Sequence, residues 1–371
     1  MRTFRSDNNA GVCPEALDAM LAAARDDHAM GYGGDGATDR AVAAFRALLG
    51  DSARVFFVGT GTAANTLAIA AMTRPWQRVL GHAHSHWNDD ESTAPELFTG
   101  CRTTLIHTEA LQRGSRLTPD DIRRAGAATR GDVHQPQPGV LTISNPTEFG
   151  EAYTPEQTAA LAREAHALGY RLHVDGARFA NAVAASLSAK GIDPARASAS
   201  DAANAARALS ADAGVDALSF GGTKNGLALG EAVVFFDQPG PTRGAGAQAA
   251  HDFPYLRKRA GHLLSKHRFV SAPFAATIES GAWLRHAAHA NAMAARLAEG
   301  LRGIEVAAVF PVDVNAVFVR LPPHIDAALK AAGHGYYGFG DPAWGVSRLM
   351  CSFDTTAADV DALLADARTA R

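Results

Sequence analysis

The sequence predicts an α/β fold built on a mostly parallel sheet, and two observations support this prediction. Short runs rich in β-branched or aromatic residues alternate with alanine-rich segments of helical period, as in strands joined by crossover helices. The chain also has 371 residues, of which 47% are hydrophobic and 20% are charged. This length allows roughly two domains and a large core.

Seven segments have the composition and length of strands. They are residues 55–58, 78–80, 103–107, 140–144, 171–174, 217–220 and 232–236. Because alanine-rich helical segments separate most of them, we expect one seven-stranded sheet with helices on both faces. A smaller αβ set toward the C-terminus is expected to stand apart from this sheet.

One crossover helix has clear signals at both ends. Thr154 offers a capping hydroxyl, Pro155 fits the first helical position, and Gln157 completes a capping box. Gly169 can end the helix in the left-handed conformation. The next strand therefore follows at once and leaves Asp175 at its carboxyl end, where open α/β sheets bind ligands.

Composition divides the chain into three parts. We expect an N-terminal arm over residues 1–20, a large domain over 21–245 and a small C-terminal domain over 246–371. The second boundary follows a Pro/Gly-rich segment, residues 237–246, after which long helical patterns begin. The alanine-rich stretch 182–213 fits helices with loops, and its biased composition leaves a disordered segment open.

Charge and cysteine content exclude several classes of partner. The 35 basic and 38 acidic residues give a net charge of −3, so neither nucleic acid nor an anionic membrane surface is an expected partner. No segment approaches the roughly 18 to 20 apolar residues of a membrane span, and the first 20 residues are too polar for a signal peptide. Cys13, Cys101 and Cys351 are scattered and none belongs to a Cys-x-x-Cys pair, which argues against disulfides and against a thiolate zinc site. We expect a cytoplasmic protein.

A strand, a Gly/Thr turn and a helix follow one another around Gly61 and Thr62. Backbone N–H groups and the helix dipole favour an anion at such a helix start. The turn also matches a dinucleotide fingerprint, which would need an acidic residue at the end of the next strand. That strand is followed by Gly-His-Ala-His-Ser-His instead. A single phosphate is therefore favoured over a dinucleotide or a purely structural turn.

Three alternating histidines, His82, His84 and His86, precede a group of acidic residues. Imidazole and carboxylate suit zinc, so a metal hydrolase is one interpretation. The usual hydrolase pattern places an aspartate directly before the third histidine, where this chain has Ser85. We therefore expect most of these histidines to be structural and leave a role for one of them open.

Two further strand ends carry a carboxylate and an amine. Asp175 is followed three residues later by Arg178, and a Gly-Gly turn presents Lys224, one of only five lysines in the chain. Alone, they would be a surface ion pair and a solvated lysine. Together with the Gly61 turn they supply what pyridoxal phosphate requires: an amine for a Schiff base, a carboxylate for the pyridine nitrogen, and a helix start for the phosphate.

At this point the sequence resembles the low-specificity L-threonine aldolases, and the similarity extends over essentially the whole chain. The matching pieces are residues 4–7, 31–35, 59–62, 85–86 with Glu91, His134, residues 173–178 and the turn with Lys224. Each motif alone is weak, but their order and spacing are specific. The resemblance implies a pyridoxal-phosphate enzyme of the aspartate aminotransferase fold, also called fold type I.

The resemblance also implies residue roles. Lys224 would bind the cofactor covalently, Asp175 would face its pyridine nitrogen, and His86 would stack on its ring. Gly61 and Thr62 would hold its phosphate.

For the substrate, the resemblance places His134 near the hydroxyl group and assigns the carboxylate to Ser6, Arg178 and Arg348. Arg268 would reach a phosphate across a subunit boundary, and Tyr32 is a weaker interface candidate. The implied assembly is a homodimer with shared active sites, often paired into a homotetramer.

The implied reaction is retro-aldol cleavage of L-threonine, L-allo-threonine or L-phenylserine-type substrates to glycine and an aldehyde by a carbon–carbon lyase. One departure from the family lies close to the expected pocket, where Ser-Asn-Pro-Thr-Glu-Phe-Gly at 144–150 replaces Glu-Asn-Thr-His-Asn. The change resembles a bacterial branch that includes phenylserine aldolases. A second departure is Gly36, where the family commonly has proline.

The residues leave several competing functions open. A β-eliminating lyase or an aminotransferase would use the same cofactor, because the fold does not determine the reaction. A metal hydrolase built on the three alternating histidines and a binding protein that retains the fold without turnover also compete with the aldolase hypothesis. The proton acceptor is open as well, among His134, His86 and a bound water.

Overall fold

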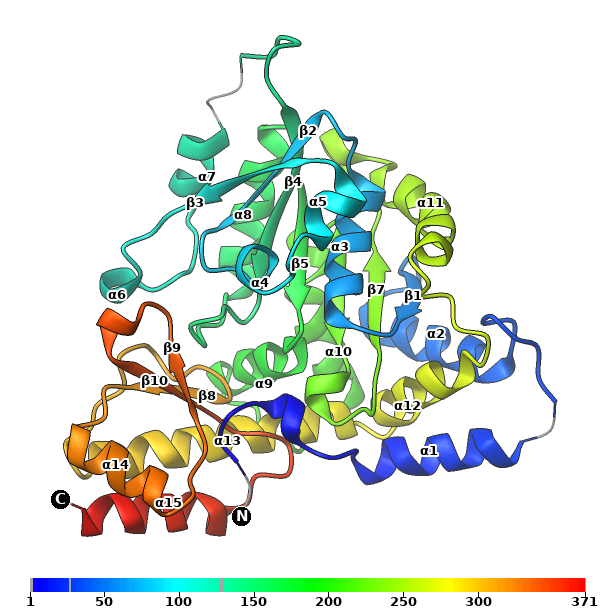
Figure 1. Cartoon of the computed structure of the whole chain (residues 1–371). Helices are drawn as coiled ribbons and strands as arrows, with labels where there is room; N and C mark the ends of the chain where they lie inside the picture. Colours follow the sequence, from blue (N-terminus) through cyan, green and yellow to red (C-terminus); the bar gives the residue numbers. More distant parts are fainter. Residues whose placement is uncertain (1–2, 27, 127–129, 371) are drawn as a thin grey trace.

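The computed structural model describes residues 3–26, 28–126 and 130–370. Its main feature is a seven-stranded sheet (Figure 1) with the order β1-β7-β6-β5-β4-β2-β3. The strands are β1 (Arg54–Val58), β2 (Gln77–His82), β3 (Arg102–Ile106), β4 (Gln137–Ser144), β5 (Arg171–Gly176), β6 (Ala217–Gly221) and β7 (Glu231–Phe235).

The prediction of a mostly parallel sheet is confirmed. Strands β3, β2, β4, β5 and β6 pair in parallel, and only β7 runs antiparallel to its neighbours β6 and β1. Each of the seven strands overlaps a segment predicted from the sequence. Because the parallel strands share one direction, their carboxyl ends meet at one edge of the sheet.

Helices cover both faces of this sheet. Those that precede the second sheet are α1 (Pro14–Arg25), α2 (Gly36–Leu49), α3 (Gly61–Met72), α4 (His86–Asp89), α5 (Ala94–Thr99), α6 (Ala110–Arg113), α7 (Pro119–Gly126), α8 (Pro155–Ala167), α9 (Phe179–Ala189), α10 (Ala199–Ala208), α11 (Ala245–Arg259), α12 (Arg268–Glu279) and α13 (Ala282–Arg302). Short 3₁₀ turns lie at η1 (Asp7–Asn9), η2 (Ala211–Ala213), η3 (Thr223–Asn225) and η4 (Gly240–Thr242).

The crossover helix α8 forms as its end signals predict. The Thr154 hydroxyl accepts the Gln157 N–H, and the Gln157 side chain accepts the Thr154 N–H, so the capping box is complete. Gly169 has a φ of +82°, as a left-handed helix stop requires. The alanine-rich stretch forms α9 and α10 with loops around them, which agrees with the helical interpretation of this segment.

A second, antiparallel sheet lies apart from the first, at the lower left of Figure 1. It has the order β8-β10-β9, with β8 (Ala316–Val319), β9 (Tyr337–Phe339) and β10 (Val346–Met350). The segments beside it are α14 (Pro323–Ala331), η5 (Pro342–Trp344) and α15 (Ala357–Thr369).

The packing of the core places the transition between the two units inside α13, and not at residue 245. Trp283 and Ala287 belong to the core of the large sheet, whereas Leu297 and Leu301 on the same helix belong to the core of the small one. Helix α11 packs on α3 and α12 packs on α2. The Pro/Gly-rich segment therefore marks a connection within the large unit, because the helices after it still need that sheet to bury their apolar faces.

A cluster of aromatic rings joins the sheet to the helices on one face. The ring centroid of Phe45 in α2 lies 5.0 Å from that of Phe220 in β6 and 5.4 Å from that of Phe274 in α12. Phe57 in β1 is a third neighbour, at 5.8 Å. All four rings are almost completely buried, so this cluster supports the strand that leads to Lys224.

We expect Phe45→Ala to lower the free energy of unfolding by about 3 to 5 kcal/mol, because it removes buried contacts and leaves a cavity between two helices and two strands. Tyr255→Ala is a matched control, since Tyr255 is 73% exposed and its loss should cost less than about 0.5 kcal/mol. Denaturant unfolding followed by circular dichroism measures both. Equal midpoints for the two variants would contradict this view of the core.

Candidate active site

The candidate site lies at the edge where the parallel strands end. Asp175 is near the end of β5, Lys224 follows β6, and the residues after β2 and β4 include His86 and Glu148. Helix α3, which follows β1, starts beside them with Gly61. The chain topology thus brings segments that are far apart in the sequence to one place.

The turn before α3 is built as an open helix start. The Thr60 hydroxyl caps the helix by accepting the Ala63 N–H at 3.2 Å. A Cβ atom added to Gly61 would meet no heavy atom within 4 Å, so the space in front of this helix start is free. The Gly59 N–H donates to Nδ1 of His262 at 3.2 Å and holds the turn against the loop after α11.

Asp175 is a buried carboxylate that the site keeps ionised. One oxygen accepts the Ala177 N–H at 3.0 Å, and the other accepts the Asn65 side-chain amide at 2.9 Å. Burial alone would raise the pKa of Asp175, but the charges of His86 and Lys224 together with the Ala177 N–H hold it below its usual value. The carboxylate is therefore negative at neutral pH.

His86 is fixed by a second buried carboxyl group. Its Nδ1 lies 2.9 Å from Oε1 of Glu91, which also accepts the Asn65 amide at 2.8 Å. Burial would lower the pKa of His86, but the hydrogen bond to Glu91 and the charge of Asp175 raise it. The other ring nitrogen, Nε2, has no hydrogen-bond partner among the described residues and is the atom available to a ligand.

Lys224 lies in the tight turn η3, which needs glycine on both sides. A Cβ atom on Gly222 would lie 2.6 Å from the Gly230 carbonyl oxygen, and Gly226 has a φ of +97°. The Asn225 amide donates to the Trp283 carbonyl at 2.7 Å and anchors the turn. Within the described ranges the half-buried Lys224 amine makes no hydrogen bond or ion pair, which leaves it available for reaction.

Glu231 stabilises the Lys224 turn through a hydrogen bond to its backbone. This buried residue, which is 7% exposed, starts β7, and its Oε2 accepts the Gly222 N–H at 2.6 Å. Burial raises the pKa of Glu231 to about 7, although the Gly222 N–H, Thr223 and Lys224 oppose the shift. The carboxyl group is thus close to half protonated at neutral pH.

Two arginines stand at the other end of the site. The Arg178 guanidinium binds Asp7 through two hydrogen bonds of 2.6 and 2.9 Å, and the Asn315 amide adds a third contact to Asp7 at 3.1 Å. Burial would raise the pKa of Asp7, but Arg178 lowers it. Arg348 contacts the Arg5 carbonyl beside Ser6 at 3.5 Å, and its buried Nε has no hydrogen-bond partner among the described residues.

A pocket of about 430 Å³ opens next to Arg348. Its polar wall includes Ser85, His84 and Glu148. Phe149 and Tyr337 contribute apolar and aromatic surface. A small molecule with one carboxylate and an apolar group fits this combination of side chains.

The structure does not bring every predicted residue to this edge. His134 is exposed and precedes β4, whereas the site lies where β4 ends at Ser144. Eight residues of extended strand separate the two edges by about 25 Å. His134 therefore does not reach the site that one chain builds, and its role near the substrate hydroxyl stays a prediction.

Tyr32 and Arg268 lie near each other in the fold, and both are far from Asp175 in the sequence. The Tyr32 N–H donates to the Ser265 carbonyl at 2.9 Å, the ring faces the Lys258 ammonium, and the residue is 55% exposed. Arg268 begins α12 three residues after Ser265. Their assignment to a subunit interface stays a prediction.

The three alternating histidines do not form a common metal site. His82 bonds to the Thr108 hydroxyl at 2.8 Å, and burial lowers its pKa to about 4. His84 faces the pocket, and His86 bonds to Glu91. Because the side chains have different partners, the hydrolase hypothesis loses its geometric basis.

Sequence reasoning missed several residues that complete the site. The most important are Asn65, which bridges Asp175 and Glu91, and Glu231 below the lysine turn. Asn65 could have been noticed as the one amide side chain on helix α3, whose other residues are apolar, glycine or threonine. Glu231 could have been noticed as a lone acid at the start of an apolar strand.

The site has the donors and acceptors that pyridoxal phosphate needs. Buried polar atoms without a hydrogen-bond partner among the described residues lie around it, namely Ser85 Oγ, Asn65 Oδ1 and Arg348 Nε. The open helix start at Gly61 suits a phosphate. The ionised Asp175 and the uncommitted Lys224 match the ring nitrogen and the aldehyde of the cofactor.

Comparison with known proteins agrees with this geometry. Residues 3–322 match the family model described as beta-eliminating lyase. A low specificity L-threonine aldolase from a Pseudomonas species is 41% identical over 368 residues, which cover 98% of this chain and 96% of the relative. The chain belongs to the beta-eliminating lyase family, among relatives of the low specificity L-threonine aldolases. The resemblance seen in the motifs is thereby confirmed.

Solved structures confirm the fold class of this family member. A threonine aldolase from Leishmania major aligns over 100% of both chains with 26% identity and a TM-score of 0.83. Aspartate aminotransferase from Thermus thermophilus aligns over 100% of this chain and 90% of its own, with 17% identity and a TM-score of 0.64. The second likeness shows the shared fold alone.

The pKa of Glu231 predicts a pH-dependent contribution to stability. Because burial raises its pKa from 4.5 to about 7, the folded state holds this proton more tightly than the unfolded state does. The contribution is complete below pH 4.5 and is lost as the pH rises through about 7, amounting to about 3 kcal/mol. Relative to Glu231→Gln, the wild type should therefore lose stability across this window.

Urea unfolding of both proteins at several pH values measures this difference. Glutamine keeps an oxygen for the Gly222 N–H, and histidines that titrate in the same range contribute equally to both proteins. If the free energies of unfolding of both proteins changed with pH in parallel, Glu231 would be ionised over the whole pH range.

Proposed function

We propose that this protein is a pyridoxal-phosphate-dependent carbon–carbon lyase of the threonine aldolase type. It cleaves β-hydroxy-α-amino acids such as L-threonine, L-allo-threonine and L-phenylserine to glycine and an aldehyde. The observation that carries the proposal is the joint placement of Lys224, ionised Asp175 and the open helix start at Gly61 on one sheet edge. The membership of the chain in the family supports it.

In this proposal, the chain holds the cofactor at four places. Lys224 binds it covalently, Asp175 faces its pyridine nitrogen, His86 stacks on its ring, and the backbone at Gly61 and Thr62 receives its phosphate. When bound, pyridoxal phosphate supplies an electron sink for the electrons released from the Cα–Cβ bond. Because Asp175 is held ionised by its neighbours, it keeps a proton on the facing nitrogen.

The amino-acid carboxylate is bound at the arginine end of the site. The Arg348 Nε is buried and without a hydrogen-bond partner among the described residues, and a guanidinium can bind a carboxylate through two hydrogen bonds. Ser6 stands beside the Arg5 carbonyl that Arg348 contacts. Fixing the carboxylate here would determine how the substrate is oriented at Cα.

The proton of the substrate's β-hydroxyl group is transferred to a group at the polar wall of the pocket. Since His134 lies at the opposite sheet edge of the same chain, the candidates that this chain itself places at the site are His86 Nε2 and a bound water. His84 and Glu148 line the same pocket and would hold such a water. A general base at this position contributes typically 10²- to 10⁴-fold to the rate.

A second candidate function is β-elimination, because the matched family model is described as beta-eliminating lyase. The products distinguish the two reactions. Cleavage of L-threonine at Cα–Cβ yields glycine and acetaldehyde, whereas elimination yields ammonia and a keto acid. We expect glycine and the aldehyde in equal amounts, and ammonia with a keto acid in their place would overturn the aldolase assignment.

We further propose a homodimer, paired into a homotetramer, in which Tyr32 and Arg268 of one chain complete the site of another. The exposure of Tyr32 and its closeness to the start of α12 support this arrangement. Among the described helices, none is both long and apolar enough to span a membrane. The three cysteines are free and buried, which supports a reducing location, and we propose the cytoplasm.

Lys224→Ala is expected to abolish covalent attachment of pyridoxal phosphate. The wild type, once loaded and treated with borohydride, should gain the mass of the cofactor on the peptide that contains Lys224, and the variant should gain none. Activity should fall by several orders of magnitude because the residue acts as a unit with the cofactor. Lys258→Ala is the control, and labelling of another lysine in the wild type would refute the assignment.

Asp175→Asn is expected to fold and to bind the cofactor but to lose most activity. The uncharged amide cannot keep the proton on the facing nitrogen, so kcat should fall by about 10²- to 10³-fold, as when one preorganised group is removed. Steady-state cleavage of L-threonine measures the loss. Turnover within a factor of about two of the wild type would contradict the role of the carboxylate.

A further inference from the structure

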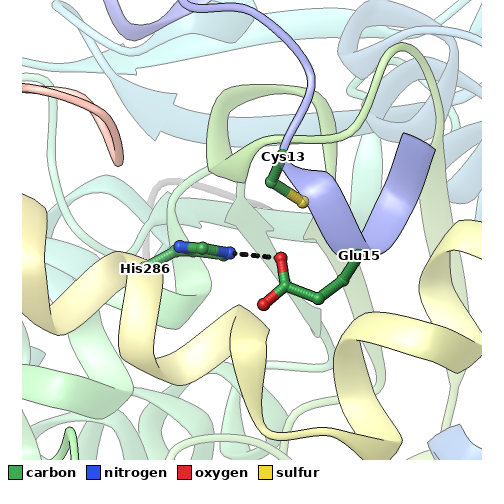
Figure 2. Close-up of side chains that lie close together, drawn as sticks. All are labelled: Cys13, Glu15 and His286. Atoms are coloured by element: carbon green, nitrogen blue, oxygen red, sulfur yellow. Dashed lines mark hydrogen bonds and ion pairs between the residues drawn. The ribbon is translucent and has the colours of Figure 1, made fainter. Parts of the chain in front are cut away.

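A group of side chains that could hold a metal ion lies outside the active site, where α1 meets α13. Cys13, Glu15 and His286 each offer one ligand atom, and these atoms all lie within 4.8 Å of one another. His286 Nε2 lies 3.1 Å from Glu15 Oε2. Figure 2 shows the three side chains directed toward one another from the start of α1 and from α13.

The set of donors suits zinc. Thiolate, imidazole and carboxylate are the ligands of protein zinc sites, with metal–ligand distances of about 2.0 to 2.3 Å. In a tetrahedral site these distances place the ligand atoms about 3.3 to 3.6 Å apart. The observed separations are at most 4.8 Å, so small side-chain rotations would bring the three atoms to this spacing.

The surroundings hold two of the ligands in place and leave one side open. Cys13 is completely buried, and its N–H donates to the Gly226 carbonyl at 2.8 Å. The His286 ring packs edge-on against Phe353 with centroids 5.2 Å apart. The Glu15 side chain is 29% exposed, which gives a metal access and leaves a fourth position for water.

Arg285 is the charged neighbour of this cluster. Its guanidinium contacts Glu15 Oε1 at 3.4 Å, while His286 contacts Oε2. A hydrogen bond from Arg285 to Glu15 would orient this carboxylate toward a metal ion. The positive charge of Arg285 also weakens the binding of a cation. A thiolate and a carboxylate together neutralise Zn²⁺, so the cluster with the metal adds no net charge next to Arg285.

We propose that Cys13, Glu15 and His286 bind Zn²⁺ and that this site fastens α1 to α13. The site also borders the turn that carries Lys224, because Gly226, which accepts the Cys13 N–H, ends that turn. The metal therefore stabilises the start of α1, which follows the segment that contains Asp7. This proposal departs from the sequence-based expectation of no thiolate zinc site, which was based on the absence of Cys-x-x-Cys pairs. The cluster needs only one thiolate.

Cobalt substitution of the cofactor-loaded protein tests the proposal. Co²⁺ bound to a thiolate absorbs by sulfur-to-metal charge transfer and, in tetrahedral sites, by visible bands at longer wavelength than the cofactor. We expect the wild type to bind one Co²⁺ per chain with these bands and to release it to Zn²⁺. Cys101→Ser, which removes another buried thiol, should behave as the wild type.

Cys13→Ser should lose the charge-transfer band, and His286→Asn should lower the affinity more than about a hundredfold, beyond the loss expected for a residue that only orients a ligand. His289→Asn, one turn further along α13, is its control. Added Zn²⁺ should also raise the melting temperature of the wild type and of Cys101→Ser, but not that of His286→Asn.

Two results would overturn the proposal. One is a wild type that takes up no Co²⁺ or Zn²⁺ after dialysis, and the other is an unchanged spectrum in Cys13→Ser. The remaining acidic and histidine cluster, His86 with Glu91 and Asp175, contains no thiol and cannot produce the charge-transfer band. The spectra, the metal content and the melting temperatures do not require catalytic turnover. They therefore test the metal site independently of the proposed aldolase activity.

Discussion

The ionised carboxylate of Asp175 is the feature on which the site depends. Desolvation alone would neutralise a carboxyl group that is only 6% exposed. Its charge is kept by the Ala177 N–H, the Asn65 amide, and the positive neighbours His86 and Lys224. The Ala177 N–H is a local contact, whereas Asn65, His86 and Lys224 come from other segments that the parallel sheet brings together.

The same carboxylate organises its neighbours in return. The Asn65 amide uses both hydrogens, one on Asp175 and one on Glu91, so the two buried carboxyl groups share one donor. Glu91 then holds His86 through Nδ1 and leaves Nε2 toward the ligand. A change at any member of this chain of hydrogen bonds would alter the orientation of the others.

Much of the fold could be predicted from the sequence because local signals agreed with the global arrangement. The seven strands have strong β-branched and aromatic character, and the Thr154 capping box determines where α8 begins. Lys224 and Asp175 could be singled out because Asp175 lies near the end of one such strand and Lys224 lies in the turn after the next. Local composition did not determine the second domain boundary, since the apolar faces of α11 and α12 find partners only after the chain has folded back.

The parts of the site that escaped prediction depend on tertiary contacts. His134 is an exception, because it precedes the predicted strand 140–144 and its place at the amino end of β4 could have been inferred from the sequence. Asn65 and Glu231 are single polar residues within apolar segments, and their partners lie 110 residues away for Asn65 with Asp175 and 9 residues away for Glu231 with Gly222. Such contacts can be recognised only when the three-dimensional arrangement of the strands is known.

The pairing of Arg178 with Asp7 has a consequence for the choice of ligand. Asp7 accepts hydrogen bonds from Nε and Nη2 of Arg178 through both of its carboxylate oxygens. Asp7 therefore already neutralises one of the two guanidinium groups near the pocket. Arg348 is the arginine that lines the pocket, and Asp89, Asp90 and Glu148 add negative charge to the same pocket. This balance suits an amino acid with one carboxylate and disfavours a dicarboxylic one, whose second acidic group would meet these carboxylates.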